Sequence, residues 1–285
     1  MIYGAKIILK YLLGIDRAGR NFAVFPDDIM VVSYPRSGNT WTRFLIANLV
    51  HPNETVSFAN IERLVPDTSS ISSSALKRIP RPRIIKSHDY FDHRYPKVIY
   101  IVRDPRDVAL SYYDFQRKYR HISDAFPIEQ YVDDFVNGRL ISASWGTWGE
   151  NVASWISTRA HKQNFLLLRF EDMLQNTRRE LIRMAEFLKL TPSDETLERA
   201  ISVSSAEHMR QLEKEQQNNW VATKKHRKDI PFVRAANAGG WKTSLPASCV
   251  AQIEAAWGEL MGSLGYLPVV SPIPEDQIGA GSPMS

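Results

Sequence analysis

A buried strand passes into a helix through the segment Val31-Val32-Ser33-Tyr34-Pro35-Arg36-Ser37-Gly38-Asn39-Thr40-Trp41. The turn exposes backbone N–H groups and the positive end of the helix dipole, both of which suit a phosphate group. Ser37, Asn39 and Thr40 add side-chain donors, and Arg36 adds a cation at the tip of the turn. The segment therefore predicts a phosphate-binding loop. The alternative is an ordinary strand–helix turn with a chance Ser-Gly pair, because such turns are common.

The loop differs from the Walker A loop of nucleoside triphosphatases. A Walker A loop needs a glycine, four residues, and then Gly-Lys-Ser/Thr, whereas Asn39 follows Gly38 and no glycine opens this turn. A kinase would also need carboxylates to hold Mg²⁺. Asp104 is the one acidic residue that ends a predicted strand in a suitable place, and a helix cap explains it better. A P-loop kinase is therefore the less favoured enzyme hypothesis.

Four short runs are apolar throughout, as strands covered by helices on both faces are. They span residues 29–33, 84–86, 98–102 and 165–168. Helical patterns lie between them, with short connections. This alternation predicts an α/β protein with a three-layer P-loop-type fold, in which helices flank a central, mostly parallel sheet.

The helical patterns begin at recognisable residues. Residues 41–49 carry a mainly apolar stripe at helical spacing. Asp104 can cap a helix whose first position is Pro105. Residues 177–188 follow the fourth strand, and Thr191-Pro192 repeats the cap-plus-proline signal, which predicts the start of another helix there. Residues 69–74 and 78–83 are predicted loops.

The composition narrows the class of protein. A net charge of +5 over 285 residues suits an anionic small molecule, a nucleic acid or an acidic surface equally well. Cys249 is the one cysteine, so a disulfide framework and a cysteine-based metal site are excluded, and a buried helix position is expected for it. No apolar run is long enough for a transmembrane helix, and the first 20 residues make a poor signal peptide. We therefore expect a cytoplasmic protein.

One domain with two flanking segments is expected. The domain spans residues 28–268, and a Gly-, Pro- and Ser-rich tail, predicted to be disordered, spans 269–285. Residues 1–27 form an amphipathic segment. On a helix, its apolar stripe comprises Ala5, Ile8, Leu9, Leu12 and Leu13, flanked by Lys6, Lys10 and Arg17. Such a helix either packs on the domain or makes a peripheral contact with an anionic membrane, and packing is the favoured hypothesis.

The phosphate-binding loop resembles that of the cytosolic sulfotransferases, which reads Tyr-Pro-Lys-Ser-Gly-Thr-Thr-Trp. Six of the eight positions match, namely Tyr34, Pro35, Ser37, Gly38, Thr40 and Trp41. The resemblance implies that residues 36–41 hold the 5′-phosphosulfate of 3′-phosphoadenosine 5′-phosphosulfate (PAPS), and that Trp41 stacks on the adenine. Arg36 replaces the family's lysine, which exchanges a point charge for a planar fork. Tyrosylprotein and carbohydrate sulfotransferases also have arginine at this place.

Two further segments resemble the same family. Ser111 lies eight residues after Arg103, the spacing with which the family binds the 3′-phosphate. Residues 232–242 look like the basic loop Phe-x-Arg-Lys-Gly-x-x-Gly-Asp-Trp-Lys, which closes over that phosphate. Ala235 and Ala236 replace a lysine and a glycine of this loop, so we expect a weaker grip on the nucleotide. The resemblance thus implies a nucleotide site that also includes Phe170, Ser205, Phe232, Arg234, Ala235 and Ala236.

A lysine and a histidine follow the second predicted strand, in Ile84-Ile85-Lys86-Ser87-His88. Ligands of open α/β sheets bind at such carboxyl ends. The segment resembles the family's Lys-Thr-His, so His88 is the predicted general base for an acceptor hydroxyl or amine. Lys86 and Arg36 would neutralise the charge on the departing product, 3′-phosphoadenosine 5′-phosphate (PAP), and no metal is required. The alternative is a non-catalytic PAP- or PAPS-binding protein on the same fold, although a pure binder needs neither Lys86 nor His88.

The acceptor is left open by the sequence. A phenol, sterol, sugar, lipid or peptide is compatible with it, and nucleic acid is not an expected partner. Trp145, Trp148 and Trp155 lie at helical spacing, for which packing in the core is favoured over substrate contact. The candidate walls of the acceptor pocket are Phe58, Phe91 and Tyr119.

The known dimer contact of the family is not expected. Many cytosolic members pair through the motif Lys-x-x-x-Thr-Val-x-x-x-Glu. After Lys242 the corresponding places hold Pro246, Ala247 and Ala251, so the hydroxyl and the charge of the motif are missing. The sequence predicts a monomer, or a dimer through another surface.

Overall fold

The computed structural model of the chain describes residues 18–140, 142, 144–216, 218, 220, 223–233 and 237–267. The predicted amphipathic helix around residues 5–17, the residues Arg234, Ala235 and Ala236, and the predicted tail at 269–285 lie outside the described residues. None of the helices in the described ranges combines the length and apolar character needed to cross a bilayer.

A parallel sheet of four strands lies at the centre of the described part of the chain. The strands are β1 (Ile29–Ser33), β2 (Ile84–Ser87), β3 (Lys97–Val102) and β4 (Phe165–Arg169), in the spatial order β2-β1-β3-β4. Each predicted strand is confirmed to within one residue at either end. Apolar runs identified the strands because both faces of the sheet are covered, and β1 is buried throughout.

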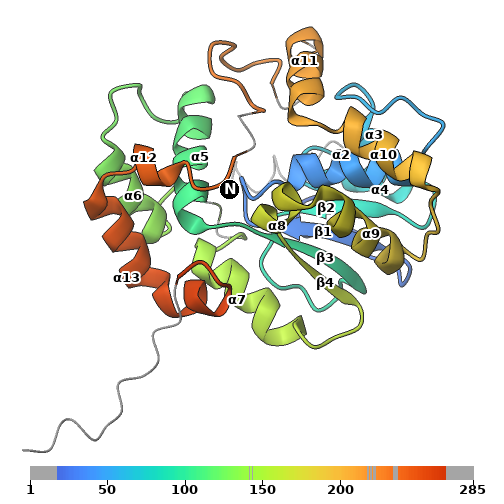
Figure 1. Ribbon diagram of the computed structural model, residues 1–285, viewed down its shortest axis with the longest axis horizontal. Coiled ribbons are helices and arrows are strands. Elements are labelled where there is room, and N and C mark those ends of the chain that lie inside the picture. The colour runs from blue at the N-terminus through green and yellow to red at the C-terminus, as the bar shows by residue number, and fades with distance from the viewer. Residues whose placement is uncertain are drawn as a thin grey trace, which may run out of the picture.

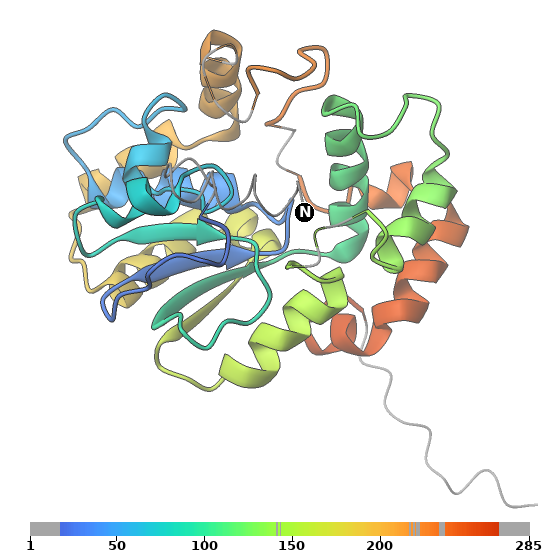
Figure 2. The ribbon, with the colours of Figure 1, turned by 180° about the vertical axis from the view of Figure 1, so that it is seen from behind.

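The helices pack on both faces of the sheet, which confirms the predicted three-layer α/β fold. Side chains of β1 alternate: Met30 and Val32 join a core shared with α5, α6, α7 and α13, while Val31 joins a core shared with α2, α9, α10 and α11. In Figure 1, α5, α6 and α13 lie to the left of the sheet, whereas α2 and α10 lie above it and α9 to its right, and Figure 2 shows both groups from behind. The described helices are α2 (Asn39–Val50), α3 (Ile61–Leu64), α4 (Ser73–Lys77), α5 (Pro105–Lys118), α6 (Ile128–Val136), α7 (Trp148–Arg159), α8 (Phe170–Gln175), α9 (Thr177–Leu188), α10 (Asp194–Val203), α11 (Ala206–Gln216), α12 (Trp241–Ser244) and α13 (Ala247–Ser263).

Most helix starts follow the sequence signals. The Asp104 side chain accepts a hydrogen bond from the Arg106 N–H, and Pro105 opens α5, as predicted. The predicted boundaries of α9 are confirmed. The prediction for the next helix is wrong, because α10 is capped by Ser193 and not by Thr191: the Ser193 hydroxyl accepts from the Thr196 N–H. When Ser193 is the cap, Asp194 and Glu195 lie in the first turn of α10, where the helix dipole stabilises negative charge.

A second correction concerns residues 69–74, predicted as a loop. The loop ends at Ser72, whose hydroxyl caps the short helix α4. The buried position expected for Cys249 is confirmed, since it lies on α13 with 1% of its surface exposed.

The strand order predicts a crevice at the carboxyl ends of the strands. The chain goes from β1 to β2 on one side and then crosses to β3 on the other, so the direction of winding reverses between β1 and β3. The connections after these two strands lead to α2 and α5, which pack on opposite faces. In open α/β sheets the space between two such connections is where ligands bind.

Candidate active site

A cleft of about 1040 Å³ opens at this reversal point. Its walls come from the carboxyl ends of the strands and from α5, α11 and the segment after α11. The cleft brings together most of the site residues predicted from sequence, namely Arg36, Gly38, Asn39, Thr40, Trp41, Lys86, His88, Arg103, Ser111, Phe170, Ser205 and Phe232. Ser37 is fully buried beside them and does not line the cleft.

Gly38 is required by the shape of the predicted phosphate-binding loop. It has a φ of 97°, in the left-handed region. A Cβ atom at this position would lie 2.4 Å from Cδ2 of Phe170, which starts α8 at the end of β4. The loop therefore turns tightly over the Phe170 ring, and this ring packs under the loop with 3% of its surface exposed.

The N-terminus of α2 is suited to binding an anion. No side-chain hydrogen bond caps α2, which is also true of α3, α6, α8, α12 and α13. Among the described residues, the buried hydroxyl of Ser37 has no hydrogen-bond partner. Uncapped N–H groups and a buried hydroxyl beside the cleft fit a bound phosphate or sulfate group.

The Asn39 side chain has another role than the one predicted. Its Nδ2 donates to the Val31 carbonyl oxygen at 3.2 Å and to Ser33 Oγ at 3.1 Å. Both amide hydrogens are thus used to attach the first turn of α2 to β1, so the expectation of a side-chain donor to phosphate is wrong. The backbone N–H of Asn39 is still part of the helix N-terminus.

Arg36 reaches from the loop to the opposite wall of the cleft. Its Nε donates to Ser111 Oγ at 3.1 Å, and its Nη2 donates to the Phe232 carbonyl oxygen at 3.2 Å. The guanidinium carbon lies 5.2 Å from the ring centre of Phe115 and 4.9 Å from that of Phe232. Arg36 therefore connects three segments that form the cleft, which are the loop, α5 and the segment after α11.

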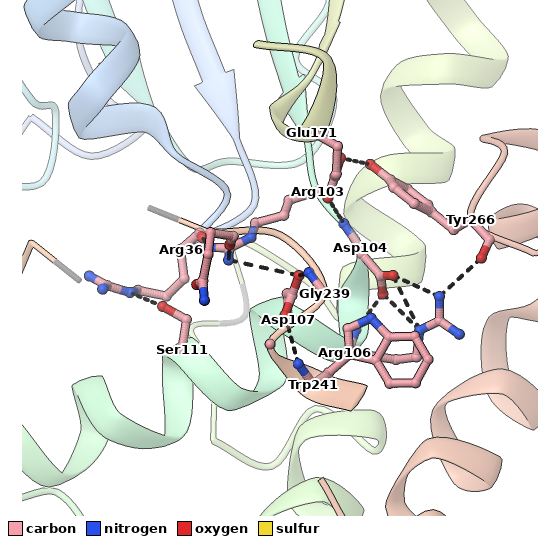
Figure 3. Close-up of polar contacts among 12 residues, drawn as sticks. Arg36, Arg103, Asp104, Arg106, Asp107, Ser111, Glu171, Gly239, Trp241 and Tyr266 are labelled. Carbon is pink, nitrogen blue, oxygen red and sulfur yellow. Dashed lines mark hydrogen bonds and ion pairs between the residues drawn. The ribbon is translucent and has the colours of Figure 1, made fainter. Parts of the chain in front are cut away.

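Arg103 connects the same loop to the last part of the chain. Its Nη1 donates to the Arg36 carbonyl oxygen at 3.2 Å and its Nη2 to the Asn237 carbonyl oxygen at 3.0 Å. Its guanidinium lies over the Phe170 ring, 4.4 Å from the ring centre. Figure 3 shows Arg103 between the loop and the carboxylate of Asp107.

Asp107 holds the described end of the predicted basic loop. Its Oδ2 accepts from the Gly239 N–H at 2.7 Å, and its Oδ1 accepts from the Trp241 N–H at 3.1 Å (Figure 3). The same carboxylate lies 4.0 Å from Arg103. This role was not predicted from the sequence, although an acidic residue in the first turn of a capped helix, four residues after Arg103, was available as a signal.

Asp104 belongs to a neighbouring network, as Figure 3 shows. Besides capping α5, it pairs with Arg106, whose guanidinium lies 3.8 Å from the ring centre of Trp241. The Asp104 N–H donates to Glu171 at 3.0 Å, and the Glu171 carboxylate accepts from the Tyr266 hydroxyl. The interpretation of Asp104 as a cap is confirmed, and its network ties α5 to the C-terminal part of the domain.

His88 has a defined tautomer. Its Nδ1 lies 2.7 Å from the Ser33 carbonyl oxygen. A carbonyl oxygen only accepts, so Nδ1 carries the hydrogen and Nε2 carries the free lone pair. Burial, together with the neighbouring Lys86 charge, lowers the pKa of His88 to about 3, so the ring is neutral at physiological pH. A neutral imidazole with a free Nε2 can accept a proton.

Asn151, which the sequence analysis missed, supports this histidine. It is fully buried on α7 and its Nδ2 donates to the carbonyl oxygens of His88, at 3.0 Å, and Trp145, at 2.7 Å. Its Oδ1 accepts from the Tyr100 hydroxyl at 2.7 Å. One buried amide therefore connects the candidate base to a tryptophan in the wall of the cleft.

Lys86 contacts a residue that the sequence analysis did not consider. Its Nζ lies 2.5 Å from Oδ2 of Asp67, and both side chains are largely buried in the wall of the cleft. The lysine predicted to neutralise a leaving group is thus ion-paired in this structure.

Two of the three tryptophans pack in the core, and the third lines the cleft, where it could contact a substrate. Trp148 and Trp155 are fully buried, as core packing predicts. Trp145 precedes α7, lines the cleft and lies edge-on to His88, with ring centres 5.6 Å apart. Of the predicted pocket walls, Tyr119 lines the cleft.

Phe58 and Phe91 do not line the cleft, so these two predictions are wrong. Phe58 is buried between Phe44 and Trp220, and Phe91 packs edge-on against Trp155. Phe58 is buried and Phe91 is half-buried, and each packs against aromatic rings of other elements.

The described part of the segment after α11 extends toward α5, as both ribbon views show (Figures 1 and 2), and several of its residues line the cleft. Glu213 on α11 accepts from the N–H groups of Phe232 and Val233, and Lys118 on α5 donates to the Arg227 and Ile230 carbonyl oxygens. His226 of this segment stacks on Tyr119, with ring centres 3.7 Å apart. The segment therefore forms a cover on the cleft.

Comparisons with known proteins agree with this arrangement. Sulfotransferase 1B1 of Canis lupus familiaris is 29% identical over 258 residues, which cover 85% of this chain and 86% of that protein. Sulfotransferase 1E1 of Bos taurus is 29% identical over 236 residues, which cover 78% of this chain and 79% of the relative.

Solved structures show the same fold. Retinol dehydratase in a complex with retinol and PAP superposes with a TM-score of 0.72 at 21% identity, covering 88% of this chain and 85% of that one. Mouse sulfotransferase SULT7A1 complexed with PAP gives a TM-score of 0.68 at 23% identity, covering 85% and 86%. A family model described as "Sulfotransferase domain" matches residues 26–265. The chain therefore belongs to the sulfotransferase domain family.

Proposed function

We propose that this sulfotransferase moves the sulfuryl group of PAPS to a hydroxyl or amine acceptor bound in the cleft, with His88 as the general base. The observation that carries the proposal is the position of His88. Its Nδ1 is fixed by the Ser33 carbonyl at the end of β1, so its free Nε2 is presented in the same cleft as the uncapped N-terminus of α2.

The donor site would use the loop and the first turn of α2. Uncapped N–H groups of residues 38–40 and the buried Ser37 hydroxyl would bind the 5′-phosphosulfate. Trp41 lines the cleft beside them and would contact the adenine. Phe170 supports the loop from below, and Ser205 lines the cleft, where it would contact the nucleoside.

Arg103 and Ser111 would bind the 3′-phosphate. The guanidinium of Arg103 is already held at the carboxyl end of β3 by two backbone carbonyls. The Ser111 hydroxyl accepts from Arg36, so its own hydrogen can be donated to a phosphate oxygen. Phe232, which lines the cleft, would complete this side of the site, and the resemblance to the family assigns Arg234, Ala235 and Ala236 to the same phosphate.

The transfer step would proceed by in-line displacement. The acceptor oxygen or nitrogen forms a bond to sulfur while the bond from sulfur to the bridging phosphate oxygen breaks. The bonding electron pair goes to that phosphate oxygen of PAP, and the acceptor proton goes to Nε2 of His88. Arg36 and Lys86 supply positive charge to the departing phosphate.

Small-molecule acceptors are supported by the relatives. Retinol dehydratase binds retinol in one solved complex and androsterone in another. An amine sulfotransferase of Oryctolagus cuniculus is 24% identical over 236 residues. In this chain, the acceptor would lie between His88 and the aromatic wall formed by Trp145 and Tyr119.

Binding of PAP tests the donor site directly. PAP without any divalent cation should raise the melting temperature, because a ligand that binds only the folded state stabilises it by mass action. Labelled PAPS, offered with a panel of phenols, alcohols and amines, then tests transfer. Stabilisation by ATP with Mg²⁺, together with no effect of PAP, would contradict the proposal.

A further inference from the structure

Asp67 reaches the active site because its segment extends the sheet. The Lys86 N–H donates to the Pro66 carbonyl oxygen at 2.8 Å, and the Thr68 N–H donates to the Lys86 carbonyl oxygen at 3.1 Å. Asp67 and Lys86 are therefore paired as parallel neighbours beside β2. This pairing fixes the two backbones side by side, so both side chains leave the sheet on the same face and can meet.

A second set of contacts holds the turn that leads to Asp67. Arg43 on α2 is buried, and its Nε donates to the Val65 carbonyl oxygen at 2.9 Å. Its Nη2 lies 3.0 Å from Glu62, whose other carboxylate oxygen accepts from the Asp67 N–H at 3.0 Å. The helix that begins at the phosphate-binding loop thus positions the carboxylate that contacts Lys86.

The Asp67–Lys86 pair can be compared with a second buried ion pair near the sheet, Asp28–Arg83. Asp28 and Arg83 are also 2.5 Å apart, with 0% and 1% of their side chains exposed, and neither lines the cleft. Asp67 and Lys86 both line the cleft. An ammonium group has three hydrogens, and Asp67 takes one of them, so the others can be donated to a ligand.

We propose that Asp67 is a positioning residue for sulfuryl transfer, which holds the Lys86 ammonium in the cleft wall and offsets its positive charge beside His88. The inference rests on the proposed function. Before the donor binds, the carboxylate prevents the lysine from turning away from the cleft. When the donor binds, its phosphosulfate oxygens compete with Asp67 for the ammonium, because both are anionic acceptors.

The charges around His88 explain why the carboxylate matters for the base. Burial lowers the pKa of His88 most, and Lys86 and Arg43 lower it further, whereas Asp67 raises it. Burial opposes ionisation of Asp67 too, but Lys86, Arg43 and His88 hold the pKa of Asp67 well below its usual range. Tyr119, directly after α5, also interacts with the Asp67 carboxylate. Burial raises the pKa of Tyr119 to about 12, so its hydroxyl stays neutral. Asp67 is therefore ionised throughout the pH range in which the enzyme works, and its negative charge raises the proton affinity of His88.

The first experiment measures PAP binding by calorimetry in a double-mutant cycle of Asp67→Asn and Lys86→Met. Asp67→Asn alone should tighten PAP binding roughly fivefold, because the ammonium loses its competing carboxylate. Lys86→Met should weaken binding, and Asp67→Asn should bring no gain in the Lys86→Met background. An equal gain in both backgrounds would show only a general loss of negative charge, and would overturn the proposal.

The second experiment measures turnover with labelled PAPS across pH. His88 must be neutral to accept a proton, so kcat falls as pH falls through the pKa of His88 in the donor complex. Loss of the Asp67 charge lowers that pKa, so the acidic limb of the profile should move to lower pH. The plateau should fall at least about tenfold, because a weaker base accepts the proton less readily. Asp67→Glu should restore part of the plateau. A lower plateau with an unmoved limb would overturn the proposal.

Asp28→Asn is the matched control. It breaks a buried ion pair of the same length, so it should lower the melting temperature without moving the acidic limb or changing PAP affinity. Failure of the proposed function itself would be seen in the unaltered chain, as absence of PAP binding. If the unaltered chain binds PAP but Asp67→Asn leaves both PAP affinity and the pH profile unchanged, the proposed function stands and the role of Asp67 is refuted.

Discussion

The Ser33 carbonyl decides which nitrogen of His88 can act as a base. Ser33 is the last residue of β1, and its carbonyl oxygen fixes the hydrogen on Nδ1. His88 follows β2, the neighbouring strand in the sheet. The tautomer is therefore a consequence of strand pairing, and it leaves Nε2 as the one proton acceptor of the ring.

His88→Ala should lower turnover by about two to four powers of ten, because the variant lacks the general base. Initial rates with labelled PAPS measure the loss, and PAP affinity should remain near that of the unaltered chain. His93→Ala is the control, since His93 is exposed and does not line the cleft. Near-normal turnover in His88→Ala would remove this residue from the mechanism.

Gly38 shows how closely the phosphate-binding loop approaches the residue after β4. Its positive φ is unfavourable for other residues, and the Phe170 ring leaves no room for a Cβ. Gly262 on α13 is different, because nothing lies within 4 Å of the place that its Cβ would take.

Gly38→Ala should lower the free energy of unfolding by roughly 1–3 kcal/mol from backbone strain and weaken PAP binding at least tenfold, because the loop must move. Gly262→Ala should be neutral or stabilising, because alanine costs less conformational entropy in a helix. Thermal melts with and without PAP compare the two. PAP binding by Gly38→Ala at full affinity would show that the tight turn is not needed for the nucleotide.

At the scale of elements, α5 organises one half of the site. Its cap, Asp104, connects it to the C-terminal part of the domain, and Asp107, in its first turn, holds the described end of the predicted basic loop. Ser111, one turn further, faces Arg36. The three side chains lie on one helix at spacings of three and four residues, which place them on neighbouring parts of its surface.

Asp107→Asn should weaken PAP binding about tenfold while the fold is retained. The Gly239 and Trp241 N–H groups bond to different oxygens of Asp107, so in the variant one of them would face the NH2 donor of the amide, and Arg103 loses its acidic neighbour. The control is Asp114→Asn, which removes the same charge from the same helix, where Asp114 pairs with Arg117 at 3.6 Å. Equal PAP affinity in the two variants would separate the basic loop from nucleotide binding.

At the scale of the whole molecule, the cleft exists because α2 and α5 leave the sheet on opposite faces. The phosphate-binding loop and Arg103 begin these two connections, and the cover from α11 reaches across to α5. Arg36 then joins the parts, since it contacts Ser111 and Phe232 at sequence separations of 75 and 196 residues. The donor site therefore depends on the packing of both halves of the domain.

The chain should be a monomer of about 33 kDa in scattering experiments, or a dimer that leaves residues 242–251 uncovered. Lys242 and Ala247 are exposed in the structure, but Pro246 and Ala251 stand where the family's pairing motif has a hydroxyl and a carboxylate. Cross-linking followed by mass spectrometry locates any contact. Links between two copies through residues 242–251 would contradict the prediction.

The sequence by itself determined the strands, the main helix starts and the family. Apolar runs identify strands that are covered on both faces, and Asp104-Pro105 identifies a helix start, because these signals act within a few residues. The prediction of a sulfotransferase fold and family is confirmed by the comparisons. The prediction of the family depended on the loop from Tyr34 to Trp41. The conformation of this loop is set by neighbouring residues in one short stretch of sequence, so the sequence alone reveals it.

The tertiary structure alone decided which side chains meet. The sequence did not indicate that Lys86 pairs with Asp67, and it placed the Asn39 side chain at a phosphate although that amide binds β1. It also gave no sign that Asn151 supports His88. These partners come from different elements, and their distance depends on strand order and on the packing of helices against the sheet. Local backbone preferences act over a turn or a strand, so they carry no information about such contacts.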